Sequence, residues 1–184
     1  RDDYAKLAIE PLEKGYGQTL GVSLRRVLLN SIEGASVTRV RIEGVQHQFS
    51  TLEGMKEDIV DFILNLKQLR FWLENEDQVT VKLSANGPGT VTGNDIKLPA
   101  GVKLANPNQE LAILANNKTN LNAEITISKG RGYILASEME RGTIGDINVD
   151  ASFSPVIKVA YKVEATRVGR QTDFDKLVMD IWTD

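Results

Sequence analysis

The sequence predicts an α+β fold that contains few helices and many antiparallel strands. Two segments, residues 20–31 and 55–69, carry apolar residues at helical spacing. From residue 69 onward, short β-rich runs are separated by turns that contain Gly, Pro and Asn, which favours antiparallel strands. The chain of 184 residues is 41% hydrophobic, which is enough for one good core or two small ones.

The first element is predicted to be a strand followed by a turn. Residues 4–9 alternate weakly between apolar and polar side chains, and Pro11 is expected to end the strand. A turn over residues 13–17 then leads into the first helix, for which Thr19 is the expected N-cap.

Three glycines, Gly15, Gly17 and Gly21, lie where this turn meets the helix. Their spacing is G-x-G-x-x-x-G, and neither a Lys-Ser/Thr pair nor a second parallel strand follows, as a phosphate-binding unit would require. We therefore expect a tight strand-to-helix turn in which glycine supplies positive φ.

The first helix is apolar on two sides. At roughly 100° per residue, one arc collects Leu20, Leu24, Val27, Leu28 and Ser31, as expected for packing on the helix's own domain. Val22 and Leu29 lie opposite, flanked by Arg25 and Arg26. Such a patch is typical of a surface that binds another protein. The alternative is an interior core around Val22 and Leu29, because fully buried helices are apolar all round.

The segments that follow predict a hairpin, a second helix and further strands. Residues 37–42 are expected to pair with residues 45–49 across a turn at Glu43 and Gly44. Residues 55–69 predict an amphipathic helix whose apolar face contains Met55, Ile59, Phe62, Ile63 and Leu66. Further strands are predicted at residues 71–73, 79–83, 111–115, 121–127, 155–164 and 177–182.

Composition excludes several classes of function. A net charge of -3 and a pI near 5.3 argue against nucleic-acid binding through bulk charge. The chain has no cysteine, hence no disulfide, thiolate nucleophile or thiolate zinc site, and a cytoplasmic location is the default expectation. Apolar runs are too short for a membrane span, and the first residues are unlike a signal peptide, so no membrane association is expected.

A catalytic or metal site is not predicted. His47 is the only histidine, and although Ser50 lies nearby, no strained nucleophile motif such as G-x-S-x-G is present. Two acidic groups lack the spacing of a calcium loop: Asp173, Asp175 and Asp180, and Glu57, Asp58 and Asp61. We therefore expect no catalytic residue, metal or cofactor in this chain.

Residues 129–133, Lys-Gly-Arg-Gly-Tyr, combine two cations with an aromatic ring. A loop of this composition could stack on single-stranded nucleic acid. A glycine-rich loop that presents Arg131 to a protein partner is at least as well supported, and both interpretations stay open.

A series of motifs runs in one order along nearly the whole chain. They include Gly17-x-Thr19-Leu20-Gly21, Leu24-Arg25-Arg26-Val27-Leu28-Leu29-x-Ser31, Gly54-x-Lys56-Glu57-Asp58, Ile63-Leu64-Asn65-Leu66-Lys67, Gly130-x-Gly132-Tyr133 and Thr172-Asp173-x-Asp175-Lys176-Leu177. Through them the sequence resembles the amino-terminal domain of the alpha subunit of bacterial-type (bacterial or plastid) RNA polymerase.

The resemblance implies a scaffold without catalytic residues of its own. In that family, two alpha domains dimerise and form the assembly platform for the beta and beta-prime subunits, which carry out polymerisation. It implies a discontinuous α/β dimerisation subdomain, residues 1–33 plus 155–184, and an inserted β-rich subdomain, residues 34–154, that contacts the large subunits. The implied location is the cytoplasm, nucleoid-associated within the polymerase, or a plastid.

The resemblance also implies residue roles. Positions matching contacts to beta are Arg25, Arg26, Leu29, His47, Phe49, Ser50, Thr51, Gly54 and Lys56. Positions matching contacts to beta-prime are Lys67, Asp173, Asp175 and Lys176. Positions matching the homodimer interface are Tyr16, Leu20, Leu24, Val27 and Leu28. Family members usually continue beyond this region into a further helix, a linker and a DNA-binding domain, so no direct DNA contact is expected from this chain.

Overall fold

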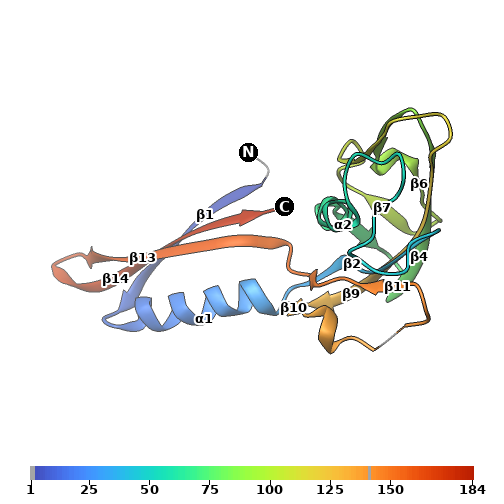
Figure 1. Cartoon of the computed structure of the whole chain (residues 1–184). Helices are drawn as coiled ribbons and strands as arrows, with labels where there is room; N and C mark the ends of the chain where they lie inside the picture. Colours follow the sequence, from blue (N-terminus) through green and yellow to red (C-terminus); the bar gives the residue numbers. More distant parts are fainter. Residues whose placement is uncertain (1–2, 141) are drawn as a thin grey trace. The chain divides into compact units, whose positions relative to one another are not determined.

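The computed structural model describes residues 3–140 and 142–184, so Arg1, Asp2 and Arg141 lie outside the described residues. The α+β prediction is confirmed: helices are few and strands dominate (Figure 1). The chain divides into two compact units, one made of Arg1–Glu33 with Ser154–Asp184 and the other of Gly34–Phe153. No helix among the described residues is long and apolar enough to cross a membrane.

The first unit is a three-stranded antiparallel sheet with one helix packed on it. The strand order is β1 (Tyr4–Glu13), β14 (Gln171–Thr183), β13 (Val156–Val168), and the helix is α1 (Tyr16–Asn30). Figure 1 shows α1 running along this sheet. The core between them is formed by Val156, Val159, Leu177, Met179 and Ile181, against which leucines of α1 pack.

The predicted end of the first strand at Pro11 is wrong. β1 continues to Glu13, with a shift of register between Ile9 and Leu12. Proline lacks the N–H that a central strand would need, but β1 lies at the edge of its sheet, where this loss is tolerated.

The start of α1 also differs from the prediction. Its N-cap is Gly15, in the left-handed region at φ +90°, so Thr19 is not the cap. The side chain that satisfies the free N–H groups comes from β14: the Asp175 carboxylate accepts hydrogen bonds from Gly15 N (2.8 Å) and Gly17 N (3.2 Å). A residue 160 positions away thus caps the helix, which local sequence patterns cannot reveal.

Only Gly15 has the positive φ expected of the three glycines. Gly17 and Gly21 lie inside α1, and both are buried. A Cβ on Gly17 would come within 2.7 Å of Val163 Cγ1, and one on Gly21 within 2.6 Å of the Tyr161 ring. These two glycines therefore let the helix backbone approach β13 closely.

The second unit is built mainly on one large sheet with the strand order β6-β4-β9-β2-β3-β7. In this sheet β11 also pairs with β2. Two further pairs are β5 with β8 and β10 with β12. The bounds are β2 (Glu33–Ile42), β3 (Phe71–Leu73), β4 (Gln78–Asn86), β5 (Gly89–Thr92), β6 (Ile96–Lys97), β7 (Val102–Leu104), β8 (Glu110–Leu114), β9 (Asn120–Arg131), β10 (Tyr133–Ile134), β11 (Asp146–Asn148) and β12 (Ala151–Ser152). Two short 3₁₀ turns lie at Gly93–Asp95 and Ala136–Glu138.

Two predictions for this unit are wrong. Residues 45–49 form no strand, and β2 pairs with β9, β3 and β11 instead of a local hairpin partner. The second helix, α2 (Ile59–Leu66), is shorter than residues 55–69 because the Asp58 side chain caps it by accepting from Asp61 N at 2.8 Å. Met55 lies outside the helix and forms a β-bridge with Leu114.

The core of the second unit lies between α2 and the inner face of the sheet. Fully buried members are Phe62 and Leu66 of α2 and Leu121, Ile125 and Ile127 of β9. The outer face of the sheet carries a hydroxyl ladder in which Thr80 contacts Thr126, and Thr38 contacts Ser128. An antiparallel sheet with one buried and one polar face is the expected arrangement.

Candidate protein-docking surfaces

The face of α1 that points away from the sheet lies opposite Gly17 and Gly21, the two residues at the contact with β13. At about 100° per residue, Arg26 lies roughly 180° from Gly17, so its side chain leaves the helix away from the sheet. Arg26 is exposed, and no hydrogen bond or ion pair joins its guanidinium to another described residue. A cation held on a rigid helix with its donors free is suited to an acceptor on another chain.

The two apolar sides of α1 are not divided as the pattern predicted. Val27, expected in the core, is 51% exposed, whereas Leu29, expected beside Arg26, is partly buried and packs on the core of the first unit. Val22 is 52% exposed, so the interior core suggested for Val22 and Leu29 does not form in this chain. Gly17 and Gly21 lie at the contact with β13, so the buried arc is rotated from the one that side-chain hydrophobicity alone predicts.

A second apolar strip runs along the other flank of α1. Tyr16, Leu20 and Val27 lie opposite the flank that carries Gln18 and Arg25, and Tyr16 and Val27 are exposed. Leu24 and Leu28 are half-buried between this strip and the sheet. The strip of Tyr16, Leu20 and Val27 is therefore available to a partner. On β1, Leu7, the partner of Met179 across the strands, is also exposed.

The predicted contact loop over residues 47–56 is irregular and exposed at its tip. Phe49 is 78% exposed, and His47 and Thr51 are exposed beside it. The Ser50 hydroxyl lies 3.1 Å from His47 Nδ1, and Ser50 N donates to His47 O at 3.1 Å. The loop is therefore a compact turn that presents an aromatic ring, a residue type that is common in interface centres.

The far end of this loop is anchored to β8. Gly54 has φ +85°, and a Cβ there would come within 1.9 Å of Thr119 Oγ1, so only glycine fits. Gly54 O accepts from Ala115 N at 2.8 Å, and Lys56 N donates to Ile113 O at 2.9 Å. Gly54 thus supports the loop, while the Lys56 side chain is exposed.

The residues matched to beta-prime contacts lie in both units. Lys67 is the half-buried C-cap of α2 in the second unit. In the first unit Asp173 is exposed, Asp175 caps α1, and Lys176 forms an ion pair with Glu10 at 2.9 Å. The Asp175 carboxylate is therefore committed to its own unit.

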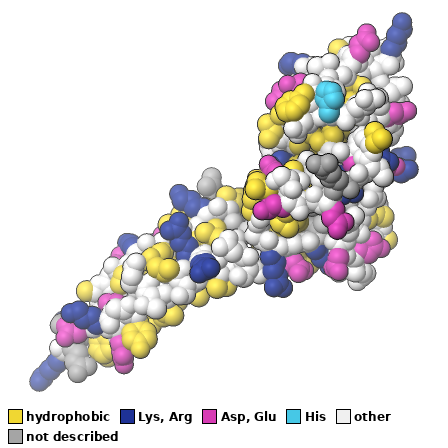
Figure 2. Space-filling model, turned by 60° about the horizontal axis from the view of Figure 1, so that its bottom comes forward, with side chains coloured by type: hydrophobic (Ala, Val, Ile, Leu, Met, Phe, Trp, Pro, Cys, Tyr) yellow, Lys and Arg dark blue, Asp and Glu magenta, His cyan; other side chains and the backbone are white. Residues whose placement is uncertain are grey.

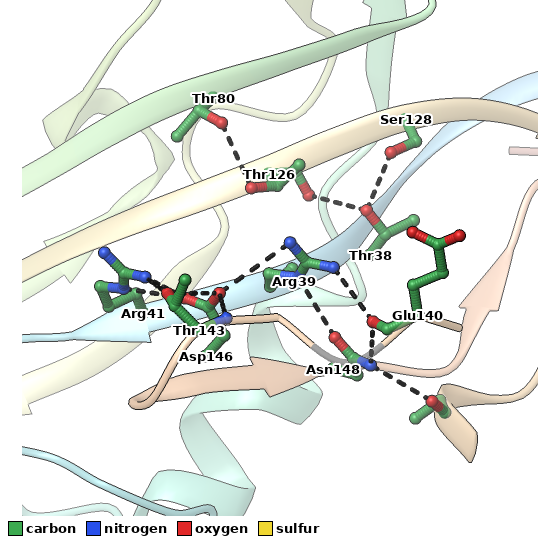
Figure 3. A network of polar contacts seen from close by, with 11 residues as sticks. Thr38, Arg39, Arg41, Thr80, Thr126, Ser128, Glu140, Thr143, Asp146 and Asn148 are labelled. Atoms are coloured by element: carbon green, nitrogen blue, oxygen red, sulfur yellow. Dashed lines mark hydrogen bonds and ion pairs between the residues drawn. The ribbon is translucent and has the colours of Figure 1, made fainter. Parts of the chain in front are cut away.

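A polar network that the sequence does not reveal lies between β2 and β11 (Figure 3). Asp146 is the cross-strand partner of Arg41, and the Arg41 guanidinium lies 2.8 Å from the Asp146 carboxylate. The same carboxylate accepts a hydrogen bond from Thr143 N at 2.8 Å. Burial alone would raise the pKa of Asp146, but the Thr143 hydrogen bonds and the Arg41 charge outweigh it and lower this pKa below its ordinary value of 3.8. The network holds a loop whose apolar residue Ile144 is 98% exposed.

The Lys129–Tyr133 segment is not the loop that was expected. β9 runs through Arg131, and Tyr133 starts β10, paired with Ser152. A Cβ on Gly130 would come within 2.8 Å of the Phe153 ring, so the glycine accommodates this ring. On the face shown in Figure 2, Lys and Arg side chains are interspersed with Asp and Glu, an arrangement that does not favour nucleic-acid binding.

The described residues contain no group of three His, Asp or Glu side chains placed to hold a metal ion. The exposed features described above are instead apolar side chains and the Arg26 guanidinium, which suit protein contacts. Residues 40–154 match the model of the RNA polymerase Rpb3/RpoA insert domain.

The chain belongs to this RNA polymerase family. It is 52% identical over 181 residues to the DNA-directed RNA polymerase subunit alpha of Frankia casuarinae, and 51% identical over 181 residues to that of Frankia alni. Each match covers 97% of this chain and 52% of the relative, so the chain spans about half the length of the curated relatives it matches. The resemblance found from the sequence motifs is confirmed.

Proposed function

We propose that this chain is an assembly scaffold of a DNA-directed RNA polymerase: it dimerises and seats the large beta and beta-prime subunits. The proposal depends on the packing of α1: the helix contacts its sheet through Gly17 and Gly21, and two of its faces are therefore left exposed to bind other proteins. Family membership and the relatives named as alpha subunits support this use of the faces. The cytoplasm, with the polymerase on the nucleoid, is the proposed location.

The two faces of α1 are assigned different partners. The strip with Tyr16, Leu20 and Val27, together with the half-buried Leu24 and Leu28, would pack on a second copy because it is apolar and uncharged. The face with Val22 and Arg26 combines an apolar centre with a guanidinium, which suits the larger, heterologous beta subunit.

The second unit is proposed to extend the contact with the beta subunit. Phe49 at the tip of the 47–56 loop would enter an apolar pocket, while His47, Ser50, Thr51 and Lys56 supply polar contacts around it. Lys67 and Asp173 are proposed to contact beta-prime through their side chains, and Asp175 and Lys176 to act by holding the local structure.

The proposal is tested with Arg26→Ala in the full-length protein, assembled with its cognate beta subunit at limiting concentration. Removing an interface-centre arginine costs about 2 to 4 kcal/mol. The affinity should therefore fall about 30- to 1000-fold. Lys6→Ala is the matched control, because Lys6 is an exposed cation on β1 of the same unit. Equal binding by Arg26→Ala and Lys6→Ala would refute the role of Arg26.

A further inference from the structure

Among the described residues of the first unit, the longest unpaired strand edge belongs to β13. This strand has 13 residues, pairs with β14 on one side, and is the last strand of the sheet. In an antiparallel strand, every second residue directs its N–H and C=O toward the free side. β13 therefore offers a row of backbone donors and acceptors, which is the template that an added strand requires.

A groove of about 560 Å³ follows this edge. It is lined by Gln18 and Arg25 of α1 and by six consecutive residues of β13, Lys158 to Val163. Alternate residues of a strand point to opposite faces, so a groove lined by consecutive residues runs along the strand edge and not over one face. Six residues span about 17 Å at about 3.3 Å per residue, which matches an extended segment of similar length.

The charges of the groove select the occupant. Arg25, Lys158 and Lys162 carry positive charge, and no carboxylate is among the described residues that line it. Lys162 also pairs with Glu164 at 2.6 Å, which offsets its charge, and Lys158 lies 4.8 Å from the Trp182 ring centroid. Arg25 and Lys158 therefore supply most of the net positive charge of the groove. An extended segment with carboxylates would find both hydrogen-bonding edge groups and complementary charge.

A second copy of this chain fits the edge poorly. If two β13 strands paired antiparallel around Ala160, Lys158 of each copy would lie opposite Lys162 of the other. Like charges directly opposite each other destabilise a strand pair. Edge lysines of this kind prevent self-pairing while leaving the edge open to an acidic strand.

We propose that the β13 edge binds an extended, acidic segment of the beta subunit as an added fourth strand. This inference rests on the proposed docking of beta to α1, and it adds the mode of recognition: strand addition beside the helix. Arg25 then contacts carboxylates of the added segment, while Arg26 on the outer face contacts the body of the partner.

The test is amide hydrogen exchange of the full-length protein, free and assembled with its cognate beta subunit. The outward amides of residues 156–168 should exchange at least about tenfold more slowly in the complex. If the complex forms and these amides exchange as in the free chain, strand addition is refuted while the scaffold proposal stands. Concentration-dependent protection without beta would mean that a second copy occupies the edge, and would also refute the inference.

A second experiment, with a synthetic peptide, tests the inference even if the complex with the beta subunit does not form. The probe is a capped seven-residue peptide of alternating Val and Glu, with a version N-methylated at every second residue as the control. The unmodified peptide should protect the same amides, and Arg25→Gln should weaken its binding about tenfold. Arg167→Gln, on β13 outside the groove, should not. Equal binding of both peptides, or binding of neither, would overturn the proposal.

Discussion

The close approach of α1 to β13 makes Gly21→Ala the sharpest test of how the first unit is built. The added Cβ would lie 2.6 Å from two carbons of the Tyr161 ring and 3.1 Å from Leu177 Cδ1. The ring has little room to move, because Gln18 Nε2 donates to its hydroxyl at 3.0 Å. Behind it, Leu177 is fully buried.

Two opposing terms decide the size of the effect. Alanine is a better helix former than glycine by about 1 kcal/mol. Overpacking a core costs about 1 to 3 kcal/mol. The contact at 2.6 Å is about 1 Å shorter than a normal carbon–carbon contact, so the strain belongs at the upper end of that range. Gly21→Ala should therefore lower the free energy of unfolding of the first unit by about 2 kcal/mol.

The two tryptophans allow this unit to be followed separately, since Trp182 lies in the first unit and Trp72 in the second. In a Trp72→Phe background, the fluorescence of Trp182 reports urea unfolding, and the midpoint should fall by about 1 M for Gly21→Ala. Ser23→Ala, at an exposed site of the same helix, should stay within about 0.5 kcal/mol.

A double-mutant cycle identifies the cause. Where Tyr161→Ala has removed the ring, the 3.1 Å approach to Leu177 Cδ1 remains, so Gly21→Ala should be neutral or stabilise the helix by up to about 1 kcal/mol. If Gly21→Ala is neutral or stabilising with Tyr161 in place, the close helix–sheet contact is wrong.

Three further predictions test other parts of the chain. Asp175→Ala removes the cap of α1 and should destabilise the first unit by about 1 to 2 kcal/mol, read from the Trp182 urea midpoint. The pKa of Asp146 is lowered in the folded chain, so its carboxylate contributes stability that is present above about pH 4 and lost as the pH falls through the folded pKa. The stability of the second unit, read from Trp72 fluorescence, should therefore fall less between about pH 5 and pH 3 in Asp146→Asn than in the unchanged chain. Val27→Asp places a charge in the proposed dimer strip and should shift sedimentation toward the monomer. Because Val27 is exposed in the single chain, the far-UV circular dichroism should stay unchanged, while the thermal midpoint loses its dependence on protein concentration. An unchanged dimer would remove Val27 from the interface.

The local pattern of apolar and polar residues was enough to predict elements that bury one face against the core. The alternation of Leu121, Ala123, Ile125 and Ile127 predicted the central strand β9, and all four are buried. It failed where distant residues decide. Residues 45–49 have the apolar residues of a strand, but β2 is already paired on both sides, so no position beside it remains.

The candidate docking residues were predictable in type but not in detail. The guanidinium of Arg26 and the ring of Phe49 are exposed as a binding role requires, and the motif resemblance pointed to both. Val27 and Leu29 exchange their expected environments, because Gly17 and Gly21 draw one side of α1 onto β13 and so rotate the buried arc. The cap by Asp175 depends on a contact across 160 positions, and no local signal precedes it.

The glycines explain why one short helix can serve several contacts. A helix normally packs on its sheet through bulky side chains that hold the two layers about 10 Å apart. Residues on the flanks of such a helix are then needed to fill the space between the layers. With Gly17 and Gly21 at the contact, four leucines of α1, Leu20, Leu24, Leu28 and Leu29, pack on its own core, and much of the remaining circumference is exposed. Around the helix, Arg26 then lies about 100° from Val27 of the apolar strip on one side and about 100° from Arg25 of the groove on the other. Any change that lifts the helix from β13 should therefore weaken all three contacts together, whereas changes in one face should leave the other two intact.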